Sequence, residues 1–318
     1  MAGPLGEFDR IARFFAPLAS GFPGALGLAD DAALIDPGAG WELVVTTDAL
    51  VADVHFRKDD PPDLIARKAL RVNLSDLAAM GAEPVCYTLA TIFPSTIDEA
   101  WLAAFVRGLA ADQSEFGIAL AGGDSVGTEG PATLSVAAIG RVEKGRALRR
   151  SGAKPGDKVF VSGTVGDGAL GLLALGGKVK DDPHGTLAGR YLLPQPRLAL
   201  GRALQGRASA ALDVSDGLVA DLGHVADTSG ARIIVEVERV PLSSAARAAL
   251  AADPDLLATI LAGGDDYELA FTAPEALPDT LAGVPIACIG RVEAGSGVAV
   301  LDRQGRPVTL GVSGYRHF

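Results

Sequence analysis

Apolar and polar positions alternate along the first half of the chain in the way that marks strands separated by helices. The 63–80 segment follows two prolines and stops at Gly81, and its Leu70, Leu74 and Leu77 fall on one helical face. Thr96 and Glu99 have the spacing of a capping box, which predicts a second helix that Gly117 can end. Runs rich in Val, Ile, Leu and Thr predict strands at Trp41–Val51, 85–93, 118–121 and 133–142.

The second half repeats this kind of pattern after a connection at 144–157 that is rich in Arg, Lys and Gly. Strands are predicted at 158–162, 232–237, 267–271 and 285–292. We therefore predict two domains, residues 1–145 and 146–318. The pentapeptide Ile-Gly-Arg-Val-Glu occurs at 139–143 and again at 289–293, and a Ser-Asp pair occurs in each half. These repeats indicate two halves on related α+β plans, with a chance match as the alternative.

Composition sets limits on the function. A chain of 318 residues can bury two cores, and 48% hydrophobic with 21% charged residues is typical of globular proteins. The net charge of -11, without a basic block, argues against non-specific binding to nucleic acid or to an anionic membrane. Glu7 and Asp9 stand where a signal peptide would be positive, and no apolar run reaches the ~18 residues of a membrane span. We predict a cytoplasmic protein.

Cysteine and histidine chemistry is not indicated. Cys86 and Cys288 lie in apolar strand-like runs without metal-ligand spacing, so both are predicted to be buried free thiols. The four histidines are isolated from one another, which makes a zinc site improbable.

Acidic residues instead mark the ends of the apolar runs. Carboxylates that converge in a partly dry site repel, and they must take up protons or be neutralised by cations. Several Mg²⁺ ions are the simplest solution, because hard cations accept carboxylate, hydroxyl and carbonyl oxygens. The acidic stretches are 30–31, 46–48, 73–76, 122–124, 213–216 and 263–266.

Three of these stretches have specific interpretations. Asn73 and Asp76 share a helical face and could hold one ligand set, or form an exposed polar face. Thr46, Thr47 and Asp48 close a strand and offer hydroxyl and carboxylate oxygens, as an ordinary turn also would. The Gly122-Gly123 pair would let backbone N–H groups approach a phosphate while Asp124 holds a metal, although Gly-Gly-Asp is a common turn.

Neither of two common nucleotide-binding motifs is indicated by the sequence. Residues 166–171 match G-x-G-x-x-G, but the loop at 178–185 stands where the fingerprint needs a second strand, so a tight helix entry is the better interpretation. The G-x-x-x-x-G-K-[ST] loop is absent, because Val179 follows Lys178. Arg149 and Arg150 lie in the connection, where an Arg could grip a triphosphate bidentately or be a surface charge.

Together these motifs resemble the thiamine-monophosphate kinase family, within the superfamily of aminoimidazole ribonucleotide synthetase and selenophosphate synthetase. The resemblance runs from Gly6 to Phe318, and the Asp-Tyr-Glu-Leu segment and Tyr-x-His-Phe ending resemble the kinase in particular. Ala29 replaces a usual Gly, and Asp265 a common Glu. The motifs are 30–34, 47–48 with 55–56, 73–82, 122–124, 150–157, 213–218 and 263–269.

The resemblance implies an α+β chain of two domains. The N-terminal α+β domain would pair with a second copy across a β-barrel-like interface, and ATP would lie in the cleft beside an α/β-type C-terminal domain. Gly123, Asp124, Arg150 and Ser215 would contact ATP, and His55, Asp265 and Tyr315 would face the thiamine moiety. The implied metal ligands are Asp31, Thr46, Thr47, Asp48, Asp76, Asp124, Asp213 and Asp216.

The implied reaction transfers phosphate from ATP to thiamine monophosphate, giving thiamine diphosphate, with several Mg²⁺ ions. The acceptor phosphate is mostly ionised at neutral pH, so no general base is needed and no catalytic residue is assigned. One alternative is a synthetase of the same superfamily, although selenide chemistry would favour a Cys or Lys nearer the N-terminus than Lys58 and Cys86. The other alternative is a module that binds Mg-ATP without turnover.

Overall fold

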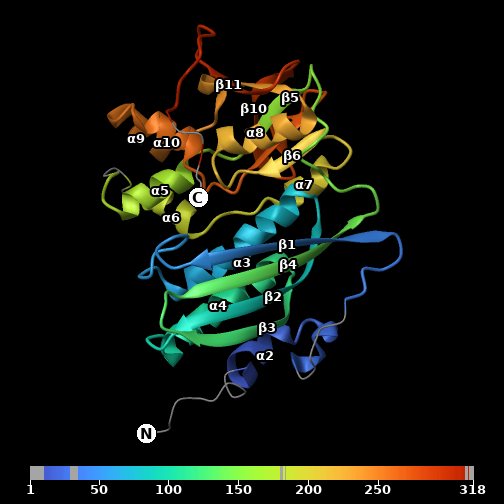
Figure 1. Ribbon diagram of the computed structural model, residues 1–318, viewed down its shortest axis with the longest axis vertical. Coiled ribbons are helices and arrows are strands. Elements are labelled where there is room, and N and C mark those ends of the chain that lie inside the picture. Colours follow the sequence, from blue (N-terminus) through green and yellow to red (C-terminus); the bar gives the residue numbers. More distant parts are fainter. Residues whose placement is uncertain (1–10, 29–34, 180–181, 183, 312–313, 315–318) are drawn as a thin grey trace. The chain divides into compact units, whose positions relative to one another are not determined.

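The computed structural model describes residues 11–28, 35–179, 182, 184–311 and 314. It divides into two compact units, the first made of Met1–Leu77 and Glu83–Lys144 and the second of Ala78–Ala82 and Gly145–Phe318 (Figure 1). Each unit combines helices with its own sheet, so the α+β class with two domains is confirmed. Asp30, Asp31 and Tyr315, which carried part of the sequence prediction, lie outside the described residues.

Unit 1 contains a four-stranded sheet in the order β1-β4-β2-β3. β4 (Thr133–Glu143) pairs antiparallel with both β1 (Trp41–Val51) and β2 (Glu83–Pro94), whereas β3 (Ala119–Thr128) pairs parallel with β2. The strand predicted at 118–121 is therefore much longer. Its second part, from Gly122 onward, is glycine-rich and polar, so only the ladder with β2 holds it extended.

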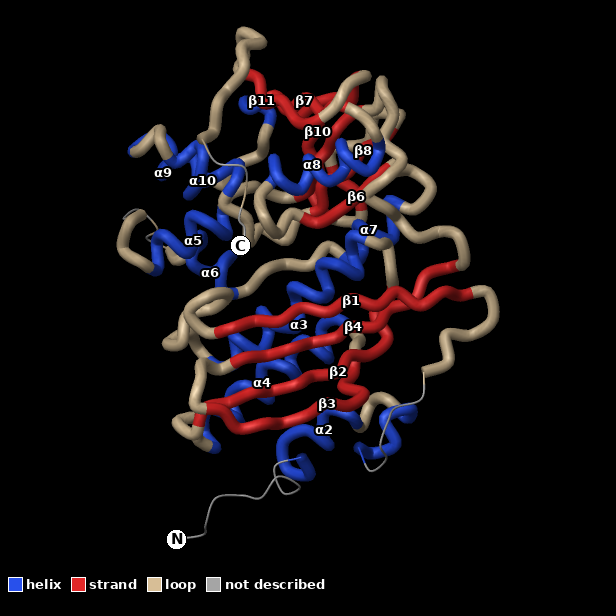
Figure 2. The backbone as a smooth tube through the Cα atoms, viewed as in Figure 1, coloured by secondary structure: helices blue, strands red, loops and turns tan. Residues whose placement is uncertain are grey.

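Two helices cover one face of this sheet (Figure 2). α3 (Pro62–Ala79) and α4 (Glu99–Phe116) are joined by a buried ion pair, in which the Arg71 guanidinium contacts Asp112 at 2.8 and 2.9 Å. Gly117 ends α4 in the left-handed conformation, as predicted. The predicted cap at Thr96 is wrong, because Asp98 is the N-cap and its carboxylate accepts the Trp101 N–H.

The opposite face of the sheet is only partly covered. η1 (Ile11–Phe15), α2 (Ala16–Ala19) and η2 (Pro23–Leu28) precede β1, and Phe22 packs on Cys86, which is fully buried. Farther along, Leu43, Val45 and Val126 expose 41%, 65% and 49% of their surface. Burial raises the pKa of the Cys86 thiol to about 11, whereas Cys288 is only half-buried, so the prediction of two buried thiols is wrong for Cys288.

Unit 2 contains a seven-stranded mixed sheet with the path β11-β7-β10-β5-β8-β6, and β9 added to β10. β11 and β7 pair in parallel, and the other ladders are antiparallel. The strands are β5 (Lys158–Ser162), β6 (Ala210–Asp213), β7 (Arg232–Glu236), β8 (Leu269–Ala273), β9 (Thr280–Leu281), β10 (Val284–Glu293) and β11 (Gly297–Leu301). The repeated pentapeptide ends both β4 and β10, but Ser75-Asp76 lies inside α3 and Ser215-Asp216 in a loop.

Helices pack around this second sheet and enclose a core centred on Leu170, Leu212, Leu222 and Ile289. None of the helices in the described residues is long and apolar enough to cross a membrane. The helices are α5 (Asp167–Leu175), α6 (Thr186–Leu192), α7 (Leu198–Leu204), α8 (Leu218–Ser229), η3 (Val237–Arg239), α9 (Ser244–Ala252) and α10 (Leu256–Ala262).

Candidate functional site

Thr46, Asp48 and Asp76 come together in unit 1. The Thr46 hydroxyl on β1 donates to Asp76 Oδ2 on α3 at 2.5 Å. Burial, and then the charge of Asp76, raises the pKa of Asp48 to about 6. Two carboxylates and a hydroxyl therefore share a partly dry site, which is the donor set that a hard divalent cation prefers.

Of the triplet Thr46, Thr47 and Asp48, Thr47 is separated from the other two by the alternation of side chains along β1. In an extended strand, successive side chains point to opposite faces, so Thr46 and Asp48 share one face and Thr47 lies on the other. Thr47 is exposed and its hydroxyl donates to the Val136 carbonyl at 3.0 Å. The structure therefore brings two of the three residues to Asp76.

Asn73 does not share the environment of Asp76, although both lie on α3. Asn73 is fully buried, and its side-chain NH₂ donates to the Ala69 carbonyl one turn earlier at 3.0 Å. Its Oδ1 is buried without a hydrogen-bond partner among the described residues. A joint Asn73–Asp76 ligand set is therefore not what the structure shows.

Gly123 and Asp124 occupy the middle of β3. A Cβ on Gly123 would lie 2.0 Å from the Leu89 carbonyl, so packing against β2 by itself requires glycine there. Asp48, Val136, Leu89 and Gly123 form one row of the sheet. Asp124 stands one row further on and is exposed, so alternation directs it to the face opposite Asp48.

His55 is held by the turn that follows β1. The Nδ1 atom of its ring accepts the backbone N–H of Val51 at 3.0 Å, and the backbone N–H of His55 donates to the Val51 carbonyl at 2.9 Å. Because a backbone N–H can only donate, Nδ1 carries no proton and the neutral ring has its proton on Nε2. The turn therefore presents the half-buried imidazole as an Nε2–H donor.

In unit 2, the loop after β6 carries Asp213, Ser215 and Asp216. Asp213 ends the strand and is buried. One oxygen of Asp221, on the first turn of α8, accepts the N–H groups of Ser215, Asp216 and Gly217 at 3.0, 3.1 and 3.1 Å. Burial and the charge of Asp216 raise the pKa of Asp221 to about 7, against these three hydrogen bonds.

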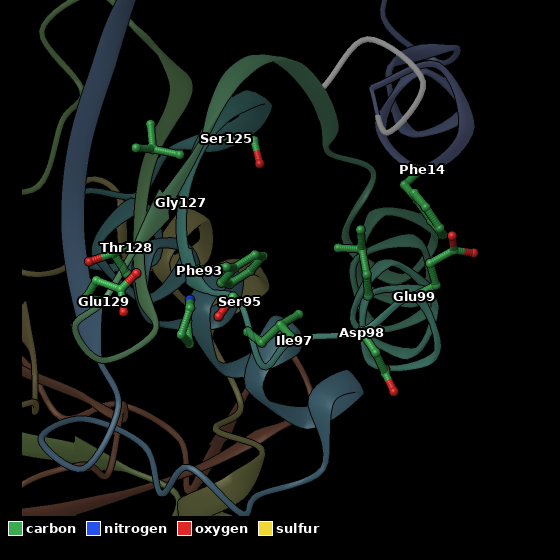
Figure 3. Close-up of a pocket in the computed structure, with 13 residues that line it drawn as sticks. Phe14, Phe93, Ser95, Ile97, Asp98, Glu99, Ser125, Gly127, Thr128 and Glu129 are labelled. Atoms are coloured by element: carbon green, nitrogen blue, oxygen red, sulfur yellow. The ribbon is translucent and has the colours of Figure 1, made fainter. Parts of the chain in front are cut away.

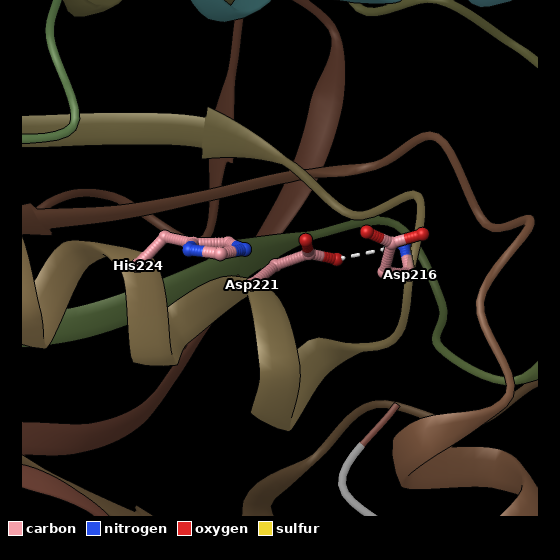
Figure 4. Close-up of side chains that lie close together, drawn as sticks. All are labelled: Asp216, Asp221 and His224. Carbon is pink, nitrogen blue, oxygen red and sulfur yellow. Dashed lines mark hydrogen bonds between the residues drawn. The ribbon is translucent and has the colours of Figure 1, made fainter. Parts of the chain in front are cut away.

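His224 lies one turn further along α8. Ligand atoms of Asp216, Asp221 and His224 are all within 4.8 Å of one another, with the Asp221 carboxylate between the other two side chains (Figure 4). Asp216 is half-buried and His224 is exposed, so solvent reaches both ends of this group. Its oxygen donors suit Mg²⁺, whereas an imidazole is a ligand that Mg²⁺ seldom uses.

A second loop, residues 263–268, runs beside the first. The N–H groups of Asp265 and Tyr267 donate to the carbonyls of Ser215 and Val214, and Val214 N–H donates to Glu268, each at 2.8 Å. Asp265 and Tyr267 have φ values of 61° and 52°, in the left-handed region. These two residues delay the strand predicted at 267–271, so β8 begins at Leu269.

The acids that flank Tyr267 point into the protein. The Asp266 carboxylate accepts the N–H groups of Gly166 and Gly168, at 2.8 and 3.1 Å, where α5 begins. Glu268 is fully buried and binds Ser162, Arg190 and Arg197. The amides of the G-x-G-x-x-G segment are therefore occupied by a carboxylate of the protein itself.

Asp265 differs from these two acids in its exposure. It is half-buried, and the Tyr267 hydroxyl donates to its Oδ1 at 3.1 Å. Arg149 and Arg150 are both exposed in the connection, and Arg149 lines a pocket of about 230 Å³ with Arg146 and Ser209. Arg150 is not among the residues that line this pocket.

A larger pocket, of about 710 Å³, lies in unit 1 and contains none of the predicted site residues (Figure 3). Phe93 and Phe14 contribute its apolar surface, and Asp98, Glu99 and Glu129 are on its wall. Its acidic wall is unsuited to a phosphate. We therefore place the candidate site at the acids and not at this cavity.

Comparison with known proteins defines the family. Residues 29–142 match the N-terminal domain of AIR synthase related proteins, and residues 154–303 match the C-terminal domain. The thiamine-monophosphate kinase of Caulobacter vibrioides is 46% identical over 99% of this chain and 92% of its own length. The chain belongs to the thiamine-monophosphate kinase family.

Other members of the kinase family agree over their full length. The Salmonella typhimurium enzyme is 44% identical, covering 98% of both chains. The crystal structure of the Stenotrophomonas maltophilia enzyme superposes with a TM-score of 0.84 over 96% of this chain and 98% of its own, at 42% identity. A structure described as AaThiL complexed with AMPPCP and TMP covers 100% of both chains at 32% identity, with a TM-score of 0.79. Family membership makes this chain a kinase.

Two residues of the site were missed by sequence reasoning. Asp221 and Asp266 make the backbone contacts described above, and neither stands out from the acids around it. Asp221 lies in the first turn of α8, where an acid near the helix N-terminus is ordinary. Asp266 belongs to the acidic stretch 263–266 beside Asp265, and the sequence does not show that its carboxylate points inward.

Proposed function

We propose that this chain transfers the terminal phosphate of ATP to thiamine monophosphate and so forms thiamine diphosphate. Family membership supports the reaction, as does the full-length likeness to a structure described as complexed with AMPPCP and TMP. The observation that carries the proposal in this chain is the pairing of Thr46 with Asp76 beside Asp48, whose pKa is raised to about 6. Such acids need a cation, and the transfer of phosphate between two anions needs one as well.

The residues fit Mg²⁺ as the cation. Asp48, Asp76, Asp213 and Asp216 supply carboxylate oxygens and Thr46 a hydroxyl, and hard cations select oxygen donors. Asp31, Thr47 and Asp124 are the other proposed ligands, with Thr47 and Asp124 on the sheet face opposite Asp48. Bound there, Mg²⁺ would screen the repulsion between the acceptor phosphate and the triphosphate.

The side chains around the reacting groups bind and orient them. Gly123, Asp124, Arg150 and Ser215 are the proposed ATP contacts. The Val51 N–H leaves the proton of the neutral His55 ring on Nε2, and we propose that this Nε2–H donates to the thiamine substrate. Asp265 and Tyr315 are the other proposed substrate contacts. No residue has to remove a proton, because the acceptor phosphate is already ionised near neutral pH. In-line transfer then depends on alignment.

The predicted roles of the two domains, the homodimer and the cytoplasmic location remain part of this proposal. Residues 1–145 would bind metal and ATP and form the dimer, and residues 146–318 would complete the ATP and substrate sites. The exposed Leu43, Val45 and Val126 support a dimer, because an apolar sheet face of this kind is a common interface. It is the face to which the register directs Asp124.

The direct test is product formation from Mg-ATP with and without thiamine monophosphate, with thiamine diphosphate separated by chromatography. Equal amounts of thiamine diphosphate and ADP would support the proposal. ADP without thiamine diphosphate would mean another acceptor, as in a synthetase of the superfamily. Absence of turnover with intact Mg-ATP binding would identify a non-catalytic module.

A further inference from the structure

Two loops of unit 2 carry proposed ligand-binding residues. Each loop is fixed by one buried carboxylate that accepts backbone N–H groups. The loop at 213–217 presents Ser215 and Asp216, and Asp221 holds it. The loop at 263–268 presents Asp265, and Asp266 holds it. In both cases the carboxylate binds consecutive or near-consecutive backbone N–H groups at the start of a helix.

The contacts of Asp221 fix three residues with a single atom. Its Oδ2 accepts from Ser215, Asp216 and Gly217 within 3.1 Å, and the side chain is only 3% exposed. Three hydrogen bonds to one buried oxygen hold these three amides together, and the dipole of α8 favours negative charge at this end. Asp221 therefore defines the direction of the backbone that carries Ser215 and Asp216.

Asp266 fixes its own loop by binding amides at the start of α5. It is 2% exposed, accepts from Gly166 and Gly168, and follows directly on Asp265. A Cβ on Gly168 would lie 2.1 Å from the Asp265 carbonyl, so the start of α5 and the loop are in close contact. Asp265 keeps its left-handed φ of 61° between this contact and its hydrogen bond to Ser215.

We propose that Asp221 and Asp266 are positioning residues of the kinase, Asp221 for the ATP and metal contacts of Ser215 and Asp216, and Asp266 for the substrate contact of Asp265. This inference rests on the proposed function for the ligands it names. The backbone amides before α8 and at the start of α5 already donate to Asp221 and Asp266. Phosphate groups must therefore be bound here through cations and side chains, not through a backbone anion nest.

The kinetic test compares Asp221→Ala and Asp266→Ala with Asp227→Asn, which removes an exposed charge from the same helix α8. A displacement of about 1 Å can cost roughly 100-fold, so we expect Asp221→Ala to raise KM for Mg-ATP at least about tenfold. Asp266→Ala should raise KM for thiamine monophosphate by a similar factor. The control should stay within about twofold of the wild type in both constants.

The conservative variants separate positioning from loss of folding. An Asn carbonyl can still accept N–H groups, so Asp221→Asn and Asp266→Asn should recover much of the KM lost in the Ala variants. Equal changes of both KM values in both variants, or unchanged values, would overturn the proposal.

Amide hydrogen exchange tests the same idea without activity. The Ser215, Asp216 and Gly217 amides should exchange faster in Asp221→Asn and Asp221→Ala than in the wild type, and the Gly166 and Gly168 amides should do so in the Asp266 variants. Unchanged exchange would overturn the positioning roles even if the wild type makes thiamine diphosphate. Faster exchange in an enzyme that makes no thiamine diphosphate would leave positioning intact and reject the proposed function.

Discussion

The Thr46 hydroxyl and the Asp76 carboxylate meet at 2.5 Å, and this hydrogen bond joins β1 to α3 beside Asp48. Burial and the negative charge of Asp76 both disfavour the ionised form of Asp48, so a bound cation would stabilise the two acids. The pair is the strongest indication of a cation site in unit 1.

Removing the charge of Asp48 should remove most of the turnover without unfolding the protein. We expect Asp48→Asn to lose at least the roughly 10- to 100-fold in activity that loss of an outer-shell partner of a metal site typically costs. Its melting temperature in the absence of Mg²⁺ should not fall, since the buried repulsion with Asp76 is relieved. Steady-state kinetics over a range of Mg²⁺ and thermal melting would measure both. The exposed Asp59→Asn is the control, and a near-normal rate of Asp48→Asn at saturating Mg²⁺ would reject the assignment.

His55 should act on substrate binding more than on the chemical step. We expect His55→Ala to raise KM for thiamine monophosphate with a smaller change in kcat, because the Nε2–H donor is lost. His184→Ala, which changes an exposed histidine of unit 2, is the matched control. Initial-rate kinetics with each variant would decide, and an unchanged KM would place the thiamine pocket elsewhere.

Glu268 should contribute strongly to the stability of unit 2. Its buried carboxylate binds Arg190 and Arg197, and removing one partner of a buried ion pair typically costs about 3–5 kcal/mol. We expect Glu268→Gln to lower the free energy of unfolding by an amount of this order, measured by urea denaturation. The exposed Glu275→Gln should be neutral. Equal stability of the two variants would show that the cluster is dispensable.

The raised pKa of the buried Asp266 should make the stability of the protein depend on pH. Burial raises its pKa to about 8, against the hydrogen bonds from Gly166 and Gly168, while an unfolded Asp titrates near ~4. The folded state therefore holds the proton more tightly. The stability that this provides is complete below about pH 4 and is lost as pH rises through about 8.

The Asn variant isolates this contribution, because it cannot titrate. The melting temperature of the wild type should fall further between about pH 6 and pH 9 than that of Asp266→Asn. Asp255→Asn, at an exposed site, should follow the wild type. Parallel pH profiles of the wild type and Asp266→Asn would contradict the raised pKa.

The exposed sheet face of unit 1 should form the dimer. Val45 exposes 65% of its surface on β1, so Val45→Lys should place a charge in the interface and convert dimer to monomer. Leu172→Lys changes an exposed apolar residue of unit 2 and should leave the dimer intact. Light scattering after size exclusion would measure the mass. A monomeric wild type, or a dimeric Val45→Lys, would reject this interface.

Local signals predicted many of the elements. β1 and β5 have the predicted bounds, and Gly117 ends α4, because alternation, apolar periodicity and a left-handed glycine act within a few residues. Errors arose where a distant segment decided the outcome. β3 continues through a glycine-rich stretch only because β2 pairs with it, and β8 starts late because Tyr267 adopts a left-handed φ beside Val214.

The sequence by itself determined the family, since this follows from residue types and motif spacing, and it predicts an acidic site that suits Mg²⁺. Only the tertiary structure decided which acids stay partly exposed and which accept backbone N–H groups inside the protein. Asp265 and Asp266 are neighbours of the same type, yet one is half-buried beside Tyr267 and the other accepts two amides at the start of α5. That difference depends on hydrogen-bond donors about a hundred residues away, which no local pattern reveals.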